Sequence, residues 1–204
     1  MNRTQVHQAP ARVAATIRPP DPADLPALTG FLAGLSTRTR VQRFFAPVRP
    51  TPAMVRRACG QPGQAGHVDV LVATHGGAII GHAMAADRAA AGESLTEIGV
   101  VVADAWQGRG VGSALVRTLV RRARARGVTS LSMDVLPGNH QVLAMIEGHW
   151  AAARTRRGAD CVTIQAGLPV GQGEYRNPAT VRVPPAERRM SLARGPAPLP
   201  ITAR

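Results

Sequence analysis

Three glycines occupy alternate positions in residues 107–113, where the sequence reads Gln107, Gly108, Arg109, Gly110, Val111, Gly112, Ser113. Glycine carries no Cβ, so such a main chain can come close to a ligand. Apolar residues recur at every fourth position from Val111, which predicts that the segment opens an amphipathic helix. The first N–H groups of a helix and its positive dipole end favour an anion, and Arg109 and Ser113 could add polar contacts. We therefore expect residues 107–113 to bind a phosphate group.

Other interpretations of this segment compete with a simple phosphate site. A Walker loop needs a lysine that reaches the terminal phosphates, and the chain contains no lysine. A dinucleotide-binding turn is imitated by Gly108, Gly110 and Ser113, with Asp134 at about the 20-residue distance that such a turn requires. However, five residues separate the preceding strand from Gly108, whereas the dinucleotide turn is tight. The dinucleotide turn and a glycine-rich helix start without a ligand stay open as alternatives.

Hydrophobic periodicity predicts an α/β fold around this segment. The expected strands are residues 13–18, 68–74, 78–85, 94–102, 129–136 and, in a less regular hairpin, 151–156 and 161–166. One helix is expected after Asp21, and three further helices are expected at residues 51–59, 110–126 and 139–148. Thr51 is placed to cap the helix that it opens. The second half of strand 94–102 is apolar throughout, which predicts a central strand covered on both faces.

Length and composition bound the domain organisation. A chain of 204 residues with 45% hydrophobic residues can bury one ordinary core. We expect one catalytic-sized domain at residues 13–167. Residues 1–12 are predicted to be a disordered N-terminus, and residues 168–204 a disordered tail rich in proline and arginine.

The net charge and the cysteines limit the kinds of ligand, metal and partner that we expect. The net charge of +13 attracts polyanions, but only 3% of the residues are aromatic, so a base-stacking nucleic-acid surface is not expected. Cys59 and Cys161 lie at no metal-ligand spacing, which argues against a metal site. No apolar run is long enough for a signal peptide or a membrane span. We expect a cytoplasmic protein without membrane contact, and the oligomeric state stays open.

The glycine-rich segment resembles a known signature. Gln107, Gly110 and Gly112 match the Gln/Arg-x-x-Gly-x-Gly/Ala pattern of the GCN5-related N-acetyltransferase (GNAT) superfamily, with an expected strand before it and a helix after it. Residues 35–40 (Leu-Ser-Thr-Arg-Thr-Arg) and 43–45 (Arg-Phe-Phe) resemble the acetyltransferase domain of bacterial protein lysine acetyltransferases. The resemblance implies a GNAT-type fold, in which a mixed central sheet is flanked by helices and splayed between two neighbouring strands.

The resemblance also implies acetyl-CoA as the co-substrate. The main chain of Val100, Val101 and Val102 would bond the pantetheine arm, and an N–H there can polarise the thioester carbonyl. Residues 107–113 would hold the pyrophosphate. Asn139 matches a family asparagine that contacts the coenzyme, although it could equally cap the helix that follows it.

Catalytic groups are only partly assigned by the resemblance. The related lysine acetyltransferases carry a glutamate at the position of Glu97, which could accept the proton of the attacking ammonium directly or through water. The tyrosine acid of many family members has no counterpart, because the only tyrosine is Tyr175 in the tail. The family's Gly-Phe pair after this helix is altered to Gly148, His149 and Trp150. No general acid can be assigned, but a thiol with a pKa near 8.5 is a fair leaving group unassisted.

The expected activity is direct transfer of an acyl group from coenzyme A to an amine. The amine is a protein lysine or belongs to a small molecule, and the sequence does not choose between them. The missing tyrosine and the altered Gly-Phe pair keep a second function open, a non-catalytic acyl-CoA sensor or interaction module. His75, His82, His140 and His149 are expected to have packing or surface roles.

Overall fold

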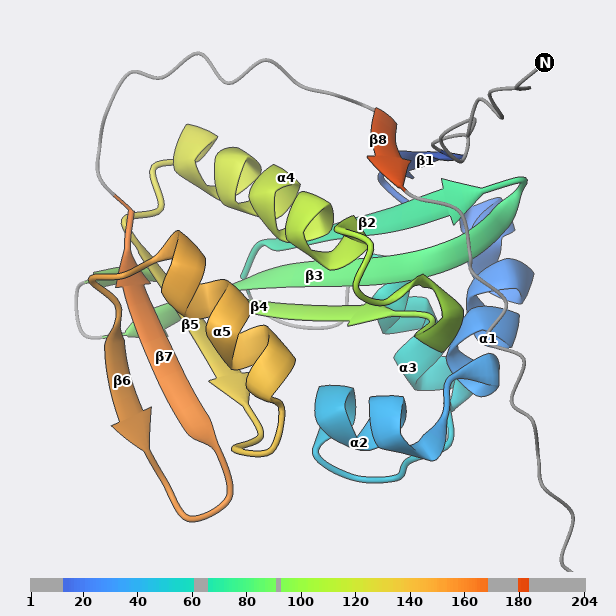
Figure 1. The fold of residues 1–204 in the computed structure, drawn as a ribbon. Coiled ribbons are helices and arrows are strands. Elements are labelled where there is room, and N and C mark those ends of the chain that lie inside the picture. Colours follow the sequence, from blue (N-terminus) through green and yellow to red (C-terminus); the bar gives the residue numbers. More distant parts are fainter. Residues whose placement is uncertain (1–12, 61–65, 91–92, 169–179, 184–204) are drawn as a thin grey trace, which may run out of the picture.

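The computed structural model describes residues 13–60, 66–90, 93–168 and 180–183, in which one mixed sheet carries helices on both faces (Figure 1). The strands are β1 (Val13–Arg18), β2 (Val68–His75), β3 (Ala78–Ala90), β4 (Glu93–Val102), β5 (Ser130–Val135), β6 (Arg154–Arg157), β7 (Val162–Gly167) and β8 (Thr180–Val183). The helices are α1 (Leu25–Gly34), α2 (Thr37–Phe44), α3 (Pro52–Ala58), α4 (Val111–Ala125) and α5 (His140–His149), with short 3-10 turns η1 (Pro22–Asp24) and η2 (Asp104–Trp106).

The sheet is interrupted at its centre. Its strand order is β6-β7-β5-β4-β3-β2-β1-β8, and all neighbours are antiparallel except β4 and β5, which are parallel. In this part of the chain, β4 and β5 pair only where residues 95–97 lie beside residues 130–132. Beyond that point the two strands diverge, as Figure 1 shows. The splay expected between these two strands is confirmed.

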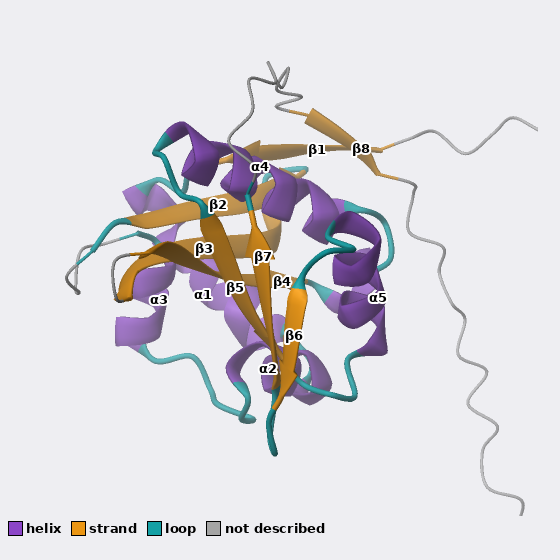
Figure 2. Ribbon diagram, turned by 90° about the vertical axis from the view of Figure 1, so that its left-hand side faces the viewer, coloured by secondary structure: helices purple, strands orange, loops and turns teal. Residues whose placement is uncertain are grey.

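Helices lie on both faces of the sheet (Figure 2), and a buried apolar cluster joins them to it on each face. Leu115 and Leu119 of α4 belong to one buried cluster together with Leu71 of β2. Leu28 of α1 belongs to the other cluster together with Val72 of β2. Neighbouring strand residues point to opposite faces, so β2 contributes to both clusters and is buried along most of its length. The central strands are therefore covered on both sides, as their apolar runs predict.

The splayed half of the sheet is covered differently. Burial alternates along β5 and β7, with apolar residues such as Met133 and Ile164 buried beneath α5. The residues between them, including Ser132, Asp134 and Thr163, are partly or fully exposed, and every residue of β6 is exposed. This half of the sheet therefore presents one polar face to solvent.

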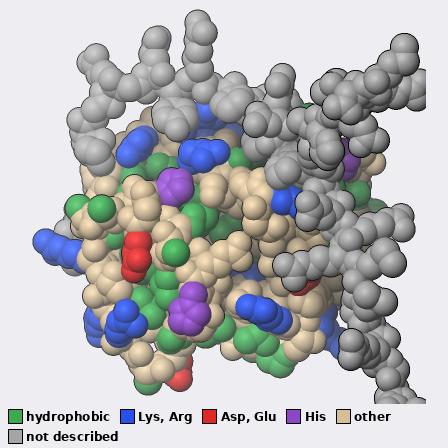
Figure 3. Space-filling view, viewed as in Figure 1, with side chains coloured by type: hydrophobic (Ala, Val, Ile, Leu, Met, Phe, Trp, Pro, Cys, Tyr) green, Lys and Arg blue, Asp and Glu red, His purple; other side chains and the backbone are tan. Residues whose placement is uncertain are grey.

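Arginine is prominent on the opposite, helical face of the molecule. α4 carries Arg117 and Arg124 as exposed residues and Arg121 as a partly exposed one. Figure 3 shows arginine side chains spread over the face that carries α4 and α5, with few acidic side chains among them. The cationic side predicted for this helix is confirmed, and it favours the approach of anions.

Most expected elements are confirmed, with boundary shifts of a few residues, and two elements were not predicted. Thr51 caps α3 by accepting the Met54 N–H (3.3 Å), as expected. α2 was not predicted as a helix because its sequence, Thr-Arg-Thr-Arg-Val-Gln-Arg-Phe, has no apolar stripe. β8 lies within the segment predicted as a disordered tail and pairs with β1 as the edge strand of the sheet, so that prediction does not hold for residues 180–183. The remaining residues of both predicted disordered ends lie outside the described residues, except Leu168, whose side chain is buried in the core.

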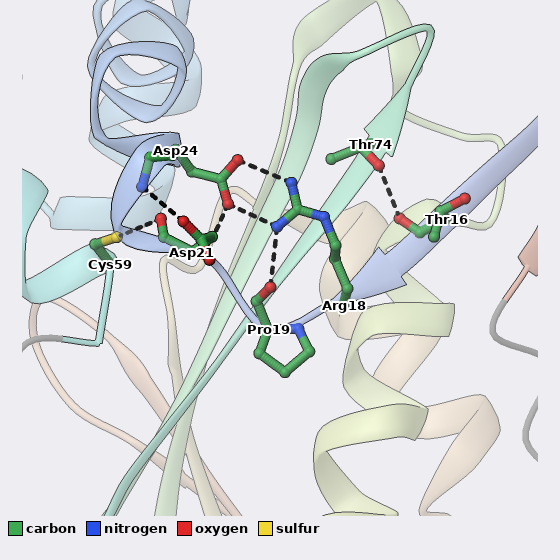
Figure 4. A network of polar contacts seen from close by, with 8 residues as sticks. Thr16, Arg18, Pro19, Asp21, Asp24, Cys59 and Thr74 are labelled. Carbon is green, nitrogen blue, oxygen red and sulfur yellow. Dashed lines mark hydrogen bonds and ion pairs between the residues drawn. The ribbon is translucent and has the colours of Figure 1, made fainter.

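An ion pair fixes the turn from β1 into the first helical layer (Figure 4). The Arg18 guanidinium donates to both carboxylate oxygens of Asp24, at 2.6 and 2.8 Å. Asp24 also accepts the Asp21 N–H at 2.7 Å, and Asp21 in turn accepts the Ala23 N–H at 2.8 Å. The hydrogen bonds from Arg18 and then from Asp21 lower the pKa of Asp24 to about 2. The carboxylate is thus held in its charged form at ordinary pH.

The His82 side chain is buried between β3 and the end of α3, and it is neutral. It is 3% exposed, and its Nε2 bonds the Ala58 carbonyl at the end of α3 (2.9 Å). A carbonyl only accepts, so Nε2 carries the hydrogen. Burial, reinforced by the positive charge of Arg43, lowers the pKa of His82 to about 4. The packing role expected for this histidine agrees with its position.

We expect His82 to make the fold lose stability as the pH falls from 6.5 to 4. The pKa of His82 is about 4 in the folded protein and 6.5 ordinarily. Its contribution to folding stability is therefore complete above pH 6.5. Below that pH the unfolded chain binds the proton more readily than the folded protein, so the stability declines. The full decline amounts to about 3 kcal/mol. Denaturant titrations at several pH values measure it, and His82→Gln, which can still donate to Ala58, should flatten the profile. An equally steep decline in the variant would contradict this role.

Candidate active site

The glycine-rich segment forms the turn between β4 and α4. Gly108 and Gly110 have φ angles of 71° and 82°, in the left-handed region where a side chain is strained. α4 begins at Val111, and its first main-chain bond joins the Ala114 N–H to the Gly110 carbonyl (3.0 Å). The N–H groups of residues 111–113 precede that bond and have no helical carbonyl to bond. The turn therefore presents main-chain donors together with the positive end of a helix.

A cleft of about 290 Å³ lies between this turn, the end of β4, α2 and α5. Most of the residues predicted to bind the coenzyme line it: Val100, Val101, Val102, Gln107, Gly108, Gly110, Gly112, Ser113 and Asn139. Two others do not, because the Val111 side chain is 1% exposed in the core and the Arg109 guanidinium lies 5.5 Å from the centre of the Trp106 ring. The lining residues that were not predicted are Thr39, Gln42, Arg43, Trp106, Gln141, Val142 and Met145.

Along β4, the main-chain N–H and C=O groups of every second residue point toward the splay, and those of the others point toward β3. The Ala103 N–H donates to the Ile80 carbonyl in β3 (2.9 Å), so main-chain groups at Val101 also point toward β3. Those of Val100 and Val102 point the other way, and the Val102 carbonyl accepts from Gln107 Nε2 (3.0 Å). Val100 therefore offers its N–H and its carbonyl at the open edge. The main chain of Val101, predicted to meet the coenzyme, belongs instead to the sheet.

Hydrogen bonds of Asp104 join the start of α2 to the glycine-rich turn. Its carboxylate accepts hydrogen bonds from Ser36 Oγ (2.6 Å), Thr39 Oγ1 (2.7 Å) and the Ser36 N–H (3.1 Å). Partial burial raises the pKa of Asp104, but together these hydrogen bonds outweigh it and lower the pKa below its ordinary value. Gln107 adds a bond from Nε2 to Thr39 Oγ1 (3.1 Å), so its side chain is engaged within the protein.

A smaller cavity of about 80 Å³ adjoins the cleft at the splay. Both are lined by Arg43, Val100 and Asn139, and the smaller one also by Glu97 and Asp134. Because Glu97 pairs with Ser132 and side chains repeat every second residue, Glu97 and Asp134 point to the same face of the sheet. Two carboxylates thus meet at the splay, of which only Glu97 was predicted.

Both carboxylates have partners outside the cleft. Glu97 forms an ion pair with Arg88, whose Nε donates to Oε2 at 2.5 Å, and its side chain remains 39% exposed. Asp134 Oδ1 accepts from Thr163 Oγ1 (2.7 Å). The exposure of Glu97 leaves water access to its carboxylate, which suits proton transfer directly or through water.

Arg43 of α2 reaches over β4 at Gly99. A Cβ at Gly99 would lie 2.6 Å from Arg43 Nη2 and 2.7 Å from Cζ, so a larger residue would displace the guanidinium. Arg43 Nε is buried and has no hydrogen-bond partner in the part of the chain that the structure describes. Burial lowers the pKa of Arg43, which the charge of Glu97 raises and that of Arg57 lowers further. Glu97 and Gly99 share one face of β4, so Arg43 and Glu97 lie on the same side of the strand.

Asn139 precedes α5 without capping it through its side chain. Its side chain lines both cavities. The Ser113 hydroxyl, on the facing helix, donates to Met145 Sδ of α5 (3.2 Å). A thioether is a weak acceptor, so this hydroxyl can exchange its partner for a better one. Of the two roles expected for Asn139, the helix cap is not observed, because its side chain makes no capping hydrogen bond.

The comparisons with known proteins agree with this geometry. Residues 38–149 match the Acetyltransferase (GNAT) family. The chain belongs to this family. The matched residues run from α2 to α5 and so include the cleft, and the family consists of N-acetyltransferases, which makes the chain a GNAT N-acetyltransferase. No curated protein sequence matches.

Solved GNAT structures resemble the chain over most of its length. The GNAT domain of Streptomyces lividans PAT is 29% identical with a TM-score of 0.66, and the match covers 76% of this chain and 90% of that one. The fold is also that of ribosomal-protein-alanine N-acetyltransferase from Brucella melitensis (22% identity, TM-score 0.56, 74% and 98% covered). It is shared too by yncA from Salmonella typhimurium, solved with its cofactor acetyl-CoA (19% identity, TM-score 0.56, 80% and 98% covered).

Two further findings concern the described residues alone. None of their helices has the length and apolar character needed to cross a membrane. Nowhere among them do three or more His, Cys, Asp or Glu side chains gather in a way that could hold a metal ion.

We expect Asp104→Asn to loosen α2. Oδ1 accepts from both hydroxyls and Oδ2 from the Ser36 N–H, so an amide that keeps its oxygen toward the hydroxyls turns its NH2 group toward the Ser36 N–H. Loss of that hydrogen bond to the cap residue of α2 costs roughly 1 kcal/mol. Because the pKa of Asp104 is lowered on folding, its contribution is present above the unfolded pKa and fades as the pH falls through the folded one. Hydrogen exchange at the Thr39 and Arg40 amides measures the loosening. Asp160→Asn, an exposed acid in the β6–β7 turn, is the control, and equal exchange in the two variants would contradict the role of Asp104.

Proposed function

We propose that this GNAT domain transfers an acetyl group from acetyl-CoA directly to an amine. The observation that carries the proposal is the order of groups along the cleft and the smaller cavity that adjoins it. Main-chain donors lie at the glycine-rich turn, the open edge of β4 follows, and the Glu97 carboxylate lies at the far end. A diphosphate, a pantetheine arm and an attacking amine need these three environments in that order. The acetyl-CoA held by yncA, which has the same fold, supports the assignment.

The residues of the cleft fit the coenzyme. The N–H groups of residues 111–113 and the helix end would bind the pyrophosphate. At Gly112 a Cβ would make only an ordinary contact with Val102 Cγ2, at 3.6 Å, so the protein itself would accept a small side chain there. Val100 would bond the amides of the pantetheine arm through its N–H and carbonyl. Asn139 and Ser113 would add polar contacts from the α5 side of the cleft and from α4.

Acyl transfer needs a free amine and a polarised carbonyl. Glu97 would accept the ammonium proton, directly or through water, and the Val100 N–H would polarise the acyl carbonyl. Asp134, across the splay, offers a second negative charge that favours the approach of the ammonium. The coenzyme A thiol leaves without an assigned acid, which its ordinary pKa allows.

The acceptor that we propose first is a protein lysine. Its support is the similarity to the GNAT domain of S. lividans PAT, together with the polar sheet face of β5, β7 and β6, which gives a large acceptor room to approach Glu97. A small-molecule amine is the second candidate. A non-catalytic acyl-CoA sensor is the third possibility, and thiol release in the presence of a panel of amines separates it from the other two.

We expect Gly110→Leu to abolish acetyl-CoA binding. A Cβ at Gly110 meets nothing within 4 Å in the protein, so the new side chain would project toward the ligand rather than into the fold. Gly127→Leu is a matched control, since Gly127 has a φ of 85°, no contact within 4 Å and a place at the other end of α4. Calorimetric titration with acetyl-CoA measures both variants. Equal affinity in the two variants would place the coenzyme elsewhere.

We expect Glu97→Gln to keep the affinity for acetyl-CoA and to lower turnover by about 100-fold or more, the usual contribution of a general base. Losing the exposed pair with Arg88 costs little stability. Asp134→Asn removes the other carboxylate of the same cavity and should retain most of the turnover. Thiol release at saturating acetyl-CoA measures turnover, and a Glu97→Gln variant as active as the wild type would remove Glu97 from the mechanism.

A further inference from the structure

Arg43 carries a positive charge that the described fold does not neutralise by a direct contact. The acids near it are engaged elsewhere: Glu97 with Arg88, Asp134 with Thr163, and Asp104 with Ser36 and Thr39. Arg43 Nε is buried without a hydrogen-bond partner among the described residues. Arg43 as a whole is partly exposed; its guanidinium lies 5.1 Å from the centre of the Phe44 ring and interacts with the Glu97 charge at a distance, but no acceptor bonds it among the described residues. An acceptor that enters the cavities beside it would gain a charge-assisted hydrogen bond.

The position of Arg43 is specifically built. Its guanidinium lies over Gly99, where any Cβ would come within 2.6 Å of Nη2. The hydrogen bonds of Asp104 and Gln107 hold the start of α2, and so the helix that carries Arg43, against the turn after β4. The side chain lines both the cleft and the smaller cavity, where the two join. A charge held in this way at the meeting point of two cavities is suited to a ligand.

We propose that Arg43 binds a carboxylate that the acceptor carries close to its reacting amine. The inference rests on the proposed function, because it places that amine at Glu97. It adds a chemical requirement that the acceptor must meet: an acid next to the amine. Such an acid is either the α-carboxylate of a free amino acid or the side chain of an acidic residue beside a lysine in a peptide.

The spacing of the two groups fits such an acceptor. Glu97 and Gly99 are two residues apart on one face of β4, a separation of about 7 Å. A ligand that bonds a partner at each end uses about 3 Å for each contact. This separation of the two Cα atoms suits an ammonium and a carboxylate that lie a few ångströms apart in space, either adjacent in a free amino acid or brought together from neighbouring side chains of a peptide. The planar fork of a guanidinium bonds both oxygens of a carboxylate, which gives direction as well as charge.

The donor does not supply this anion. The proposed pyrophosphate position lies at the glycine-rich turn, at the other end of the cleft. The pantetheine arm and an acetyl group carry no charge. Only an acidic acyl group, such as a succinyl group, would bring a carboxylate to Arg43 from the donor side, and succinyl-CoA therefore belongs in the test.

The experiment uses the full chain and measures thiol release at saturating acetyl-CoA. One arm compares free amino acids with their carboxamides, and the other compares lysine peptides that carry Glu or Gln beside the lysine. We expect the carboxylate member of at least one arm to be preferred by tenfold or more in kcat/KM. Arg43→Gln should reduce that preference, the ratio of kcat/KM between the carboxylate member and its neutral partner, to about one. The arm that responds identifies the source of the carboxylate.

Two further variants keep the test decisive. Gly99→Ala displaces the guanidinium without removing the charge and should also lower the preference, whereas Arg124→Gln, an exposed arginine near the far end of α4, should not. The proposal is overturned if neither arm shows a preference, if the preference survives in Arg43→Gln, or if Arg43 matters only with succinyl-CoA. In those cases acetyl-CoA binding and turnover of neutral amines persist. If no amine releases thiol, the proposed function itself fails, and this inference fails with it.

Discussion

The site depends on the point at which β4 and β5 stop pairing. Parallel strands that stayed together would use the Val100 main chain for the ladder and leave no space between them. Pairing ends after Glu97 and Ser132, so β4 continues with one edge bonded to β3 and the other edge open. Buried main-chain groups that lack partners are costly. The open edge is therefore a constraint on everything around it: α2 and α5 must flank it without filling it, and a ligand that can bond it gains directly.

The turn after β4 performs two tasks at once. Its glycines present N–H groups to an anion, while Asp104, two residues beyond β4, holds the first turn of α2. Gln107 joins the two, because its amide bonds both Thr39 and the Val102 carbonyl. These hydrogen bonds connect the turn to the start of α2, the helix that carries Arg43.

What the sequence could predict follows from how local each feature is. Strand and helix periodicities are local, so β4, β5, α4 and the glycine-rich turn were expected, whereas the splay between β4 and β5 was expected only from the family resemblance. α2 was not expected, because it lacks an apolar stripe, and although its cap residue Ser36 is local, the bonds of Asp104 to Ser36 and Thr39 that hold it span 68 and 65 residues. The fit of Arg43 over Gly99 joins two residues that are far apart in the sequence and have no shared pattern. The Arg43-Phe44-Phe45 triplet was noticed only through a family resemblance, and nothing in it indicated that the arginine lines the cleft.

The two ends of the cleft use different kinds of electrostatics. At the glycine-rich turn the donors are main-chain N–H groups, and the nearest arginine, Arg109, lies against the Trp106 ring rather than in the cleft lining. Binding of an anion by main-chain N–H groups does not depend on side-chain chemistry, so a chain without lysine can still provide it. At the splay, by contrast, the groups are formal charges: Glu97, Asp134 and Arg43. Formal charges act on proton transfer and on the choice of partner far more strongly than dipoles do. In the proposed reaction the acceptor would therefore meet mainly side chains, whereas the coenzyme would meet mainly the backbone, with Ser113 and Asn139 adding side-chain contacts.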